Sequence, residues 1–318
     1  METLLLQKLA EQLPLDTMVE HDHEVRSAYL QKTLRFLHLI KKADILTVEE
    51  YTYLYKLRNK INDIWRNYLK GRMNTASSQM QNMLQCSFHH QTYDMMFDRI
   101  QQLPNVLYRG RVSLMPLLDC QEFYHIPFTK RYLIQNQRYS ITGIPCLYLA
   151  GSLPCMYKEL GKTNISYGEF RPLKAFSLLD VSVSYPQMEK RRYSHEQLFA
   201  FLCTMPLKYA LSIWAKDNEK HAFKSNYVIS QLLTAAVYNR KIDIKGICYA
   251  SLLYFLFFLL YNCNLKTMHE LLIICLSQIL KRWQKNIIQA LFIRQFFGFT
   301  RCITDTFDID LSIINGSC

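Results

Sequence analysis

The chain has 318 residues, of which half are hydrophobic and a fifth are charged, so it can bury the core of one large domain or two modest ones and is not a generally disordered chain. The formal net charge of +12 favours anionic partners. The basic residues are scattered, however, and their densest clusters are as short as Lys190-Arg191-Arg192. We therefore interpret them as a solvated surface and expect no nucleic-acid partner.

The first hundred residues predict helices. Glu24–Lys42 keeps its apolar side chains near one face of a helix. A second helix is predicted from Thr47, because Glu50 stands three residues later and completes a capping box. The polar residues 74–81 indicate a loop, and Met80–Leu103 is expected to be helical again. We interpret the aromatic side chains of these helices as core rather than as a cofactor site.

The histidines and cysteines do not form the pattern of a metal site. His21-Asp22-His23 and His89-His90 are adjacent or alternate groups without a third and fourth ligand at plausible spacing, so we expect no bound metal. The ten cysteines include no CxxC pair, and their apolar neighbours favour buried, reduced thiols.

Neither end of the chain predicts export or membrane insertion. Met1–Ala10 lacks the basic start and the cleavage site of a secretory signal. The apolar run Leu252–Tyr261 is shorter than the ~20 residues that are needed to span a bilayer. We therefore expect a cytoplasmic protein with no membrane partner.

From residue 105 onward the sequence alternates between strand and helix patterns, which predicts a mixed α+β domain. Ser152 is placed as the N-cap of one of the helices. Strands are expected at 106–112, 146–150, 176–183 and 244–250, and helices at 152–160, 195–202 and 225–238.

Three separated segments of this domain resemble the RES domain, a family named for its arginine, glutamate and serine. The first is Leu107–Arg111, with the sequence Leu-Tyr-Arg-Gly-Arg. The second is Gln137–Ser152, which contains Arg-Tyr-Ser, Gly-x-Pro and Leu-Tyr-Leu-Ala-x-Ser and is followed by Glu159. The third is Tyr227–Gln231, followed by the Ile-Lys-Gly-Ile-x-Tyr-x-Ser run at 244–251. Each motif is loose by itself, but their order and spacing are fairly specific.

The resemblance implies a fold similar to that of the ADP-ribosyltransferases and an enzyme that breaks the nicotinamide–ribose bond of NAD. NAD is then the substrate, and no cofactor is expected. Many members of the family look like toxins of toxin–antitoxin pairs, so an antitoxin protein is an implied partner. The catalytic residues that the resemblance implies are Arg109, Glu159 and Ser251.

The chemistry of the reaction suits these residue types. A carboxylate beside the ribose stabilises an oxocarbenium-like transition state, and this role is expected for Glu159. A guanidinium makes charge-assisted bonds to a pyrophosphate, so Arg109 is the first anion contact and Arg138 the second. Ser251 is expected to donate a hydroxyl to the ribose or to the nicotinamide.

The remaining expected binding residues are less specific. Tyr108 and Tyr148 are candidates for the flat wall that a nicotinamide ring needs. Tyr139 lies in the Arg-Tyr-Ser stretch, and Gln231 matches a family position of uncertain role. Taken one at a time, most of these residues would be ordinary surface or core residues. Only their joint occurrence favours a site.

After Ser251 the sequence departs from the family, where a further strand is expected. The tail is rich in Ile, Leu, Lys, Asn and Phe. One hypothesis is a shifted reading frame over the last ~65 residues or a degenerate gene. The other is a native helical addition, with Met268–Phe292 as an amphipathic helix. We accordingly divide the chain into a helical N-terminal region (1–104), a RES domain (105–251) and an atypical tail (252–318).

The sequence thus predicts an NAD-degrading enzyme that uses water or phosphate as the acceptor and acts as a toxin or defence effector. Transfer of ADP-ribose to a macromolecule is the nearest enzymatic alternative. A non-catalytic interaction protein with a degenerate RES domain is the alternative from a different class.

Overall fold

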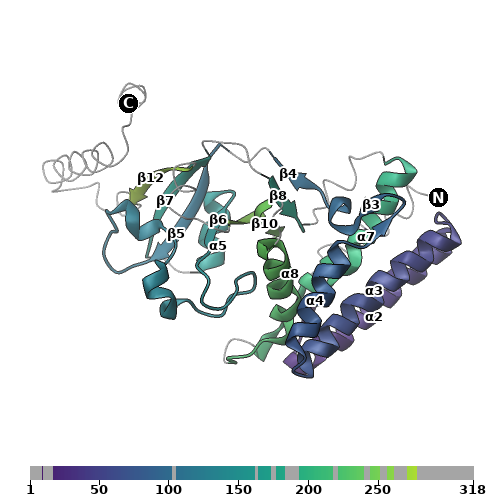
Figure 1. The fold of residues 1–318 in the computed structure, drawn as a ribbon. Coiled ribbons are helices and arrows are strands. Elements are labelled where there is room, and N and C mark those ends of the chain that lie inside the picture. The colour runs from purple at the N-terminus through teal and green to yellow at the C-terminus, as the bar shows by residue number, and fades with distance from the viewer. Residues whose placement is uncertain are drawn as a thin grey trace, which may run out of the picture.

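The fold combines a twisted sheet with a set of long helices (Figure 1). The computed structural model describes residue 9 and residues 17–101, 105–161, 164–172, 177–182, 193–217, 221–239, 244–250, 256–260 and 271–277. Within these residues most of the helices gather on one side and the sheet on the other, with α5 (Leu153–Leu160) against the sheet and α8 (Val228–Asn239) between the two groups (Figure 1). The expected α+β class is confirmed.

Three helices form most of the N-terminal region: α2 (Val25–Ala43), α3 (Val48–Leu69) and α4 (Met73–Leu84). The capping box predicted at the start of α3 is confirmed, because the Thr47 hydroxyl accepts from the Glu50 N–H and the Glu50 carboxylate accepts from the Thr47 N–H. These two bonds satisfy backbone donors that the first turn of a helix leaves unpaired.

The loop predicted at residues 74–81 is wrong, since these residues belong to α4. Their polar side chains occupy the outer face of the helix. Ala76, Met80, Met83 and Leu84 recur at helical spacing and are buried. The packing of this inner face therefore outweighs the polar composition of the segment.

The helix predicted at Met80–Leu103 is also wrong beyond Leu84. A small hairpin follows, with strands β2 (Ser87–Phe88) and β3 (Gln91–Thr92). Its two turn residues, His89 and His90, both have positive φ, as a two-residue hairpin turn of type I′ requires. After a short 3-10 turn, η2 (Tyr93–Met96), the strand β4 (Arg99–Ile100) joins the edge of the large sheet.

The large sheet has the strand order β12-β7-β5-β6-β11-β10-β8-β4. The pair β8–β10 is parallel, and the other pairs are antiparallel. The strands not yet bounded are β5 (Leu107–Val112), β6 (Leu147–Ala150), β7 (Ile165–Pro172), β8 (Ser177–Asp180), β10 (Ile244–Ala250), β11 (Leu256–Leu260) and β12 (Leu271–Ser277).

The tail contributes strands to this sheet. The helix considered for Met268–Phe292 is not formed at Leu271–Ser277, which pairs with β7 along its whole length. A short, continuous apolar run such as Leu-Leu-Ile-Ile-Cys-Leu suits a strand as well as a buried helix, and pairing with the edge of the sheet favours the strand. β11 lies between β6 and β10 and pairs with both.

Two hydrophobic clusters cover the two faces of the sheet. The larger one joins α2, α3 and α4 to α7 (His195–Leu211), to α8 (Val228–Asn239) and to one face of the sheet. Trp65 from the N-terminal region and Leu233 from α8 are both fully buried in it. The smaller cluster covers the other face of the sheet and includes Leu107, Phe123, Leu147, Leu149 and Phe170. Residues on both sides of the 104/105 boundary therefore share one core.

α7 continues well past Leu202, the end that the sequence predicted. Pro206 lies inside the helix and is buried together with its neighbours on every side. Contacts all around the helix therefore compensate for the backbone hydrogen bond that proline cannot donate. Among the described residues, no helix is both long enough and apolar enough to cross a membrane.

Candidate active site

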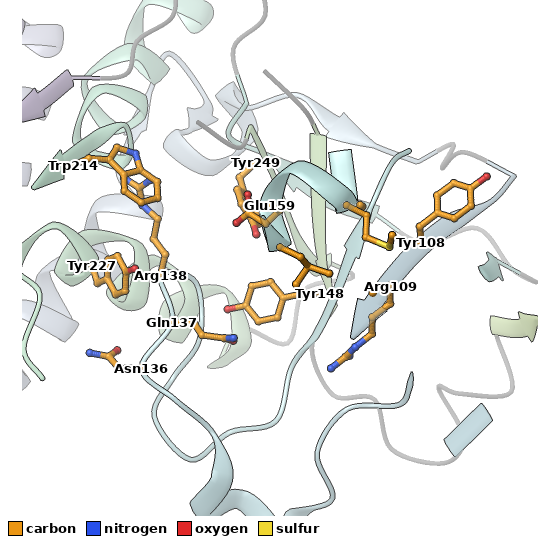
Figure 2. Close-up of a pocket in the computed structure, with 14 residues that line it drawn as sticks. Tyr108, Arg109, Asn136, Gln137, Arg138, Tyr148, Glu159, Trp214, Tyr227 and Tyr249 are labelled. Atoms are coloured by element: carbon orange, nitrogen blue, oxygen red, sulfur yellow. The ribbon is translucent and has the colours of Figure 1, made fainter. Parts of the chain in front are cut away.

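A cavity of about 320 Å³ opens where β5 and β6 diverge. These two neighbouring strands share the single bridge pair Tyr108–Ala150, so their remaining lengths separate and leave room for side chains (Figure 2). The cavity is lined by Tyr108, Arg109, Gly110, Asn136, Gln137, Arg138, Tyr148, Ala150, Met156, Glu159, Leu160, Trp214, Tyr227 and Tyr249.

The structure brings together most of the residues that the sequence singled out. Five of them line this one cavity: Tyr108 and Arg109 from β5, Arg138 from the loop before β6, Tyr148 from β6 and Glu159 from the following helix. Two others, Tyr139 and Gln231, lie behind its wall. The third residue of the predicted catalytic set, Ser251, lies outside the described residues.

Glu159 reaches the cavity from the last turn of α5 (Leu153–Leu160). The predicted cap of this helix is confirmed, because the Ser152 hydroxyl accepts from the Cys155 N–H. The helix ends at Gly161, whose φ of 56° is left-handed and suits glycine. The carboxylate is exposed to the cavity and stands at the end of the helix where the dipole disfavours negative charge. Such a position suits a functional role better than a stabilising one.

The Glu159 carboxylate changes the ionisation of its neighbours. Burial, the Tyr148 phenol and the Glu159 carboxylate together raise the pKa of Tyr249 well above its ordinary value. Burial and Glu159 also raise the pKa of the Cys155 thiol to about 12. Both side chains are therefore neutral at pH 7, and Cys155 is not an activated nucleophile. Figure 2 shows Glu159 beside Tyr249.

Gly110 explains how α5 comes so close to β5. A Cβ atom at this position would stand 2.5 Å from Leu160 Cδ1 and 2.8 Å from Met156 Sδ. Both distances are shorter than a carbon or sulfur contact allows, so a larger residue here would require the side chains of Leu160 and Met156 to shift. The glycine in the Arg-Gly-Arg motif thereby leaves room for the side chains next to Glu159 on α5.

Arg109 faces the opposite side of β5 from Gly110, because side chains alternate along a strand. It pairs in register with Gly168 of β7 and is half-buried. Figure 2 shows its guanidinium pointing away from Glu159. The side chain of Arg109 and the helix that carries Glu159 therefore lie on opposite sides of β5.

Arg138 is partly engaged by the protein. Its guanidinium stacks over Trp214 at 4.5 Å from the ring centre, and its Nη2 donates to the Ile213 carbonyl at 3.0 Å. Stacking fixes the plane of a guanidinium while its remaining edge can meet an anion. Burial raises the pKa of the nearby Tyr148 phenol, which the Ser140 side chain and the Tyr139 backbone only partly offset. The Tyr148 phenol is therefore neutral and available as a donor.

One face of α8 makes hydrogen bonds to residues 136–139, the segment of the cavity wall that carries Arg138. Ser230 Oγ donates to the Arg138 carbonyl at 2.6 Å, and Thr234 Oγ1 donates to the Tyr139 carbonyl at 3.2 Å. Gln231 Nε2 donates to Asn136 Oδ1 at 2.6 Å and to the Gln137 carbonyl at 2.9 Å. The structure therefore places Gln231, expected to bind substrate, in contact with the wall.

Tyr139 also supports the wall from behind. Its ring stacks on Tyr249 with the centres 4.3 Å apart, and it is almost fully buried. Two of the cavity residues that the sequence did not assign, Trp214 and Tyr227, come from the short elements β9 (Ile213–Ala215) and η6 (Ser225–Tyr227). A three-residue strand has no periodicity, so no signal pointed to Trp214. Tyr249 stood within a quoted motif and could have been assigned.

The histidines considered as metal ligands have other contacts. The rings of His21 and His23 stack with their centres 5.4 Å apart, and His89 and His90 form the hairpin turn. The described part of the chain contains no group of three or more His, Cys, Asp or Glu side chains that could hold a metal ion.

Over 167 residues the chain is 31% identical to a Bacillus subtilis (strain 168) protein described as "Putative toxin YopC". The match covers 47% of this chain and 37% of the relative, so the chain spans little more than a third of that relative's length. No protein family matches the chain, and no solved structure matches it. The similarity to a toxin therefore extends over about half of the chain.

Proposed function

We propose that this chain is a RES-type enzyme that cleaves the nicotinamide–ribose bond of NAD, by hydrolysis or phosphorolysis, and acts as a toxin or defence effector. The observation that carries this proposal is the meeting of Glu159, Arg109 and Arg138 in one cavity with tyrosine walls. The three side chains come from distant segments, so their common location does not follow from their neighbours in the sequence.

The cavity suits one half of a dinucleotide. Its volume of about 320 Å³ is near the lower end of the range for small-molecule sites. The neutral phenols of Tyr148 and Tyr249 offer flat walls and hydroxyl donors. We infer that the nicotinamide and its ribose enter beside Glu159, while the phosphates meet the guanidinium groups.

The reaction needs few groups. The bond between ribose C1′ and the nicotinamide nitrogen breaks, and its electron pair neutralises the pyridinium, so nicotinamide leaves uncharged. The Glu159 carboxylate stabilises the positive charge that grows on the ribose. Water or phosphate then forms the new bond to C1′. When water is the acceptor, its proton can pass to Glu159.

Glu159→Gln keeps the size and polarity of the side chain but removes its charge. We expect nicotinamide release to fall by about 10²- to 10³-fold, as is typical when one electrostatic contact to the transition state is lost. Release is measured by chromatography, and folding is checked by thermal unfolding. Glu196→Gln is the matched control, because Glu196 is an exposed helical carboxylate outside the cavity. Equal loss in both variants would contradict the role of Glu159.

The fate of the ADP-ribose half separates the enzymatic alternatives. NAD labelled in its adenine ring should yield free ADP-ribose in water, or ADP-ribose 1-phosphate when phosphate is the acceptor. Label that stays attached to a macromolecule would favour ADP-ribosyl transfer. Intact NAD in the presence of folded protein would favour a non-catalytic interaction protein.

The proposed toxin role is supported by the described name of the Bacillus subtilis relative. Consumption of NAD would halt growth of the cell that makes the enzyme, so an antitoxin protein is the partner that this role implies. Expression of wild-type chain and of Glu159→Gln in a bacterial host tests the role, with arrest expected only for the wild type.

A further inference from the structure

Part of the cavity wall is held by a segment at the start of the N-terminal region. The wall residues Trp214 and Tyr227 lie in the stretch 212–227. Residues 17–24, here called the arm, contact residues 212–217 and Ser225 of this stretch, although about two hundred residues separate them in the chain. The contacts of the arm give the N-terminal region a role in the site.

The first contact is a short parallel ladder. The strand β1 (Thr17–Val19) pairs with β9, and Met18 stands in register with Trp214. The Thr17 N–H also donates to the Ser212 carbonyl at 3.1 Å. The arm therefore pairs with the backbone on both sides of Trp214, the residue whose ring stacks on Arg138.

The second contact is a set of bonds to Ser225, at the start of η6 and two residues before Tyr227. Asp22 Oδ1 accepts from the Ser225 N–H at 2.8 Å, and the Asp22 carbonyl accepts from the Ser225 hydroxyl at 2.8 Å. Trp65 Nε1, from α3, donates to the Ser225 carbonyl at 3.1 Å. Ser225 is buried, so loss of these partners would leave polar groups without water to replace them.

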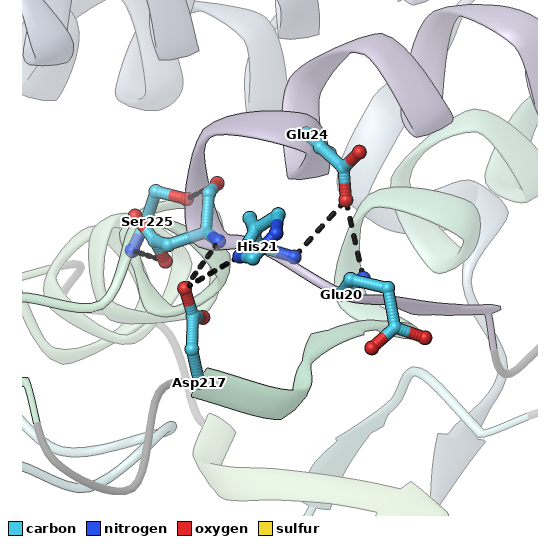
Figure 3. Close-up of polar contacts among 6 residues, drawn as sticks. Glu20, His21, Glu24, Asp217 and Ser225 are labelled. Carbon is cyan, nitrogen blue, oxygen red and sulfur yellow. Dashed lines mark hydrogen bonds and ion pairs between the residues drawn. The ribbon is translucent and has the colours of Figure 1, made fainter.

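The arm itself is held in shape. The Glu24 carboxylate accepts from the N–H groups of Glu20 and His21, at 3.1 and 3.0 Å (Figure 3). The Asp217 carboxylate lies close to the N–H of Asp22 and to the ring of His21. Figure 3 shows the Asp217 carboxylate beside His21. These bonds fix the direction in which Asp22 presents its carboxylate.

We propose that the arm is a positioning element of the proposed NAD site and that Asp22 is its main residue. Asp22 touches neither the cavity nor its expected ligand. It acts through Ser225 on Tyr227, and the β1 ladder acts through Trp214 on Arg138. The activity part of this inference rests on the proposed function, whereas the positioning of the wall does not. The helical N-terminal region then completes the site and is not a separate module.

The first test compares Asp22→Ala with Asp22→Asn. The alanine variant leaves the Ser225 N–H unpaired, while asparagine keeps an oxygen acceptor in its place. We expect Asp22→Ala to raise KM for NAD about tenfold, the size expected for one buried unpaired donor, with kcat changed less than about twofold. Asp22→Asn should stay near the wild-type values. Asp63→Ala, which removes a surface ion pair with Arg66, is the neutral control.

The second test does not need NAD cleavage. Amide hydrogen exchange over residues 212–227 should speed up about tenfold in Asp22→Ala and remain unchanged in Asp22→Asn and Asp63→Ala. Ser225→Ala, which loses the hydroxyl bond alone, replaces Asp22→Ala if that variant does not fold. Unchanged exchange in the alanine variants would overturn the inference. Faster exchange without any nicotinamide release from wild type would refute the proposed function alone.

Discussion

Gly110 faces α5 from the strand that carries Arg109. Its missing Cβ makes room for Leu160 and Met156, and Glu159 lies between these two residues on the same helix. The motif therefore places Arg109, the proposed anion contact, next to a glycine that leaves room for the helix carrying Glu159. At the scale of single residues, the sequence identified Arg109, Arg138 and Glu159 through their motif context.

Gly110→Ala should separate geometry from stability. The added methyl group must push α5 outward or shift both side chains, which costs about 1–3 kcal/mol of unfolding free energy. Because Glu159 moves with the helix, we expect nicotinamide release to fall about 10²-fold. Both quantities are measured on the purified variant.

Gly71→Ala is the control for this substitution. Gly71 has a φ of 76° and no atom near its Cβ position, so alanine strains the backbone there without touching the cavity. It should lower the melting temperature and leave activity unchanged. A Gly110→Ala variant as active as Gly71→Ala would show that the spacing of α5 is unimportant.

Helices and strands were predictable where their periodic apolar pattern is long or where a clear capping residue marks their start. α2, α3 and α5 follow from apolar spacing and from the caps at Thr47 and Ser152. β7 was missed, because Ser166 and Gly168 interrupt its apolar pattern although both faces of the strand are covered. Ser166 instead accepts the Leu117 N–H, a contact that no local pattern reveals.

Glu50 joins two helices and gives the fold an acid-sensitive contact. Its carboxylate meets His195 Nε2 at 2.8 Å, at the start of α7. Burial by itself would raise the pKa of Glu50, but the bonds from Thr47 and His195 outweigh it and lower the pKa below its ordinary value of 4.5. A lowered carboxyl pKa contributes stability that is present above pH 4.5 and is lost as the pH falls toward the folded-state pKa.

Glu50→Gln should therefore flatten the dependence of stability on pH. We expect the variant to lose about 1 kcal/mol of unfolding free energy at pH 7. Between pH 5 and pH 3 the unfolding free energy of the variant, measured by urea unfolding, should fall less steeply than that of the wild type. Glu49→Gln, at the exposed neighbouring position, should behave like wild type. If the unfolding free energies of wild type and Glu50→Gln depended on pH in the same way, the lowered pKa of Glu50 would be refuted as the source of this acid sensitivity.

At the scale of the whole molecule, the tail supplies two strands of the large sheet, and the N-terminal region shares a hydrophobic core with the rest of the chain. β6 reaches β10 only through β11, and β12 covers the outer edge of β7. Long-range pairings of this kind could not be read from Leu252–Ser277, whose composition suits either a helix or a strand. The contacts of Trp214 with Arg138 and with the arm depend on the same global arrangement.

A chain that ends at Ala250 should not fold cooperatively. Without β11 the sheet divides between β6 and β10, and β6 keeps the single bridge to β5. Thermal unfolding followed by circular dichroism should lack a sharp transition. A chain that ends at Ser277 keeps all the described pairings and is the matched control. Equal melting temperatures for the two truncated chains would contradict the role of β11 and would support an aberrant reading frame after Ser251.

The most direct measurement of the central claim is the release of nicotinamide when purified full-length wild-type protein is mixed with NAD. The proposed function predicts one nicotinamide for each NAD consumed, with release lost in Glu159→Gln and retained in Glu196→Gln. NAD that remains intact in the presence of soluble, cooperatively folded wild-type protein, with and without phosphate, would contradict the account.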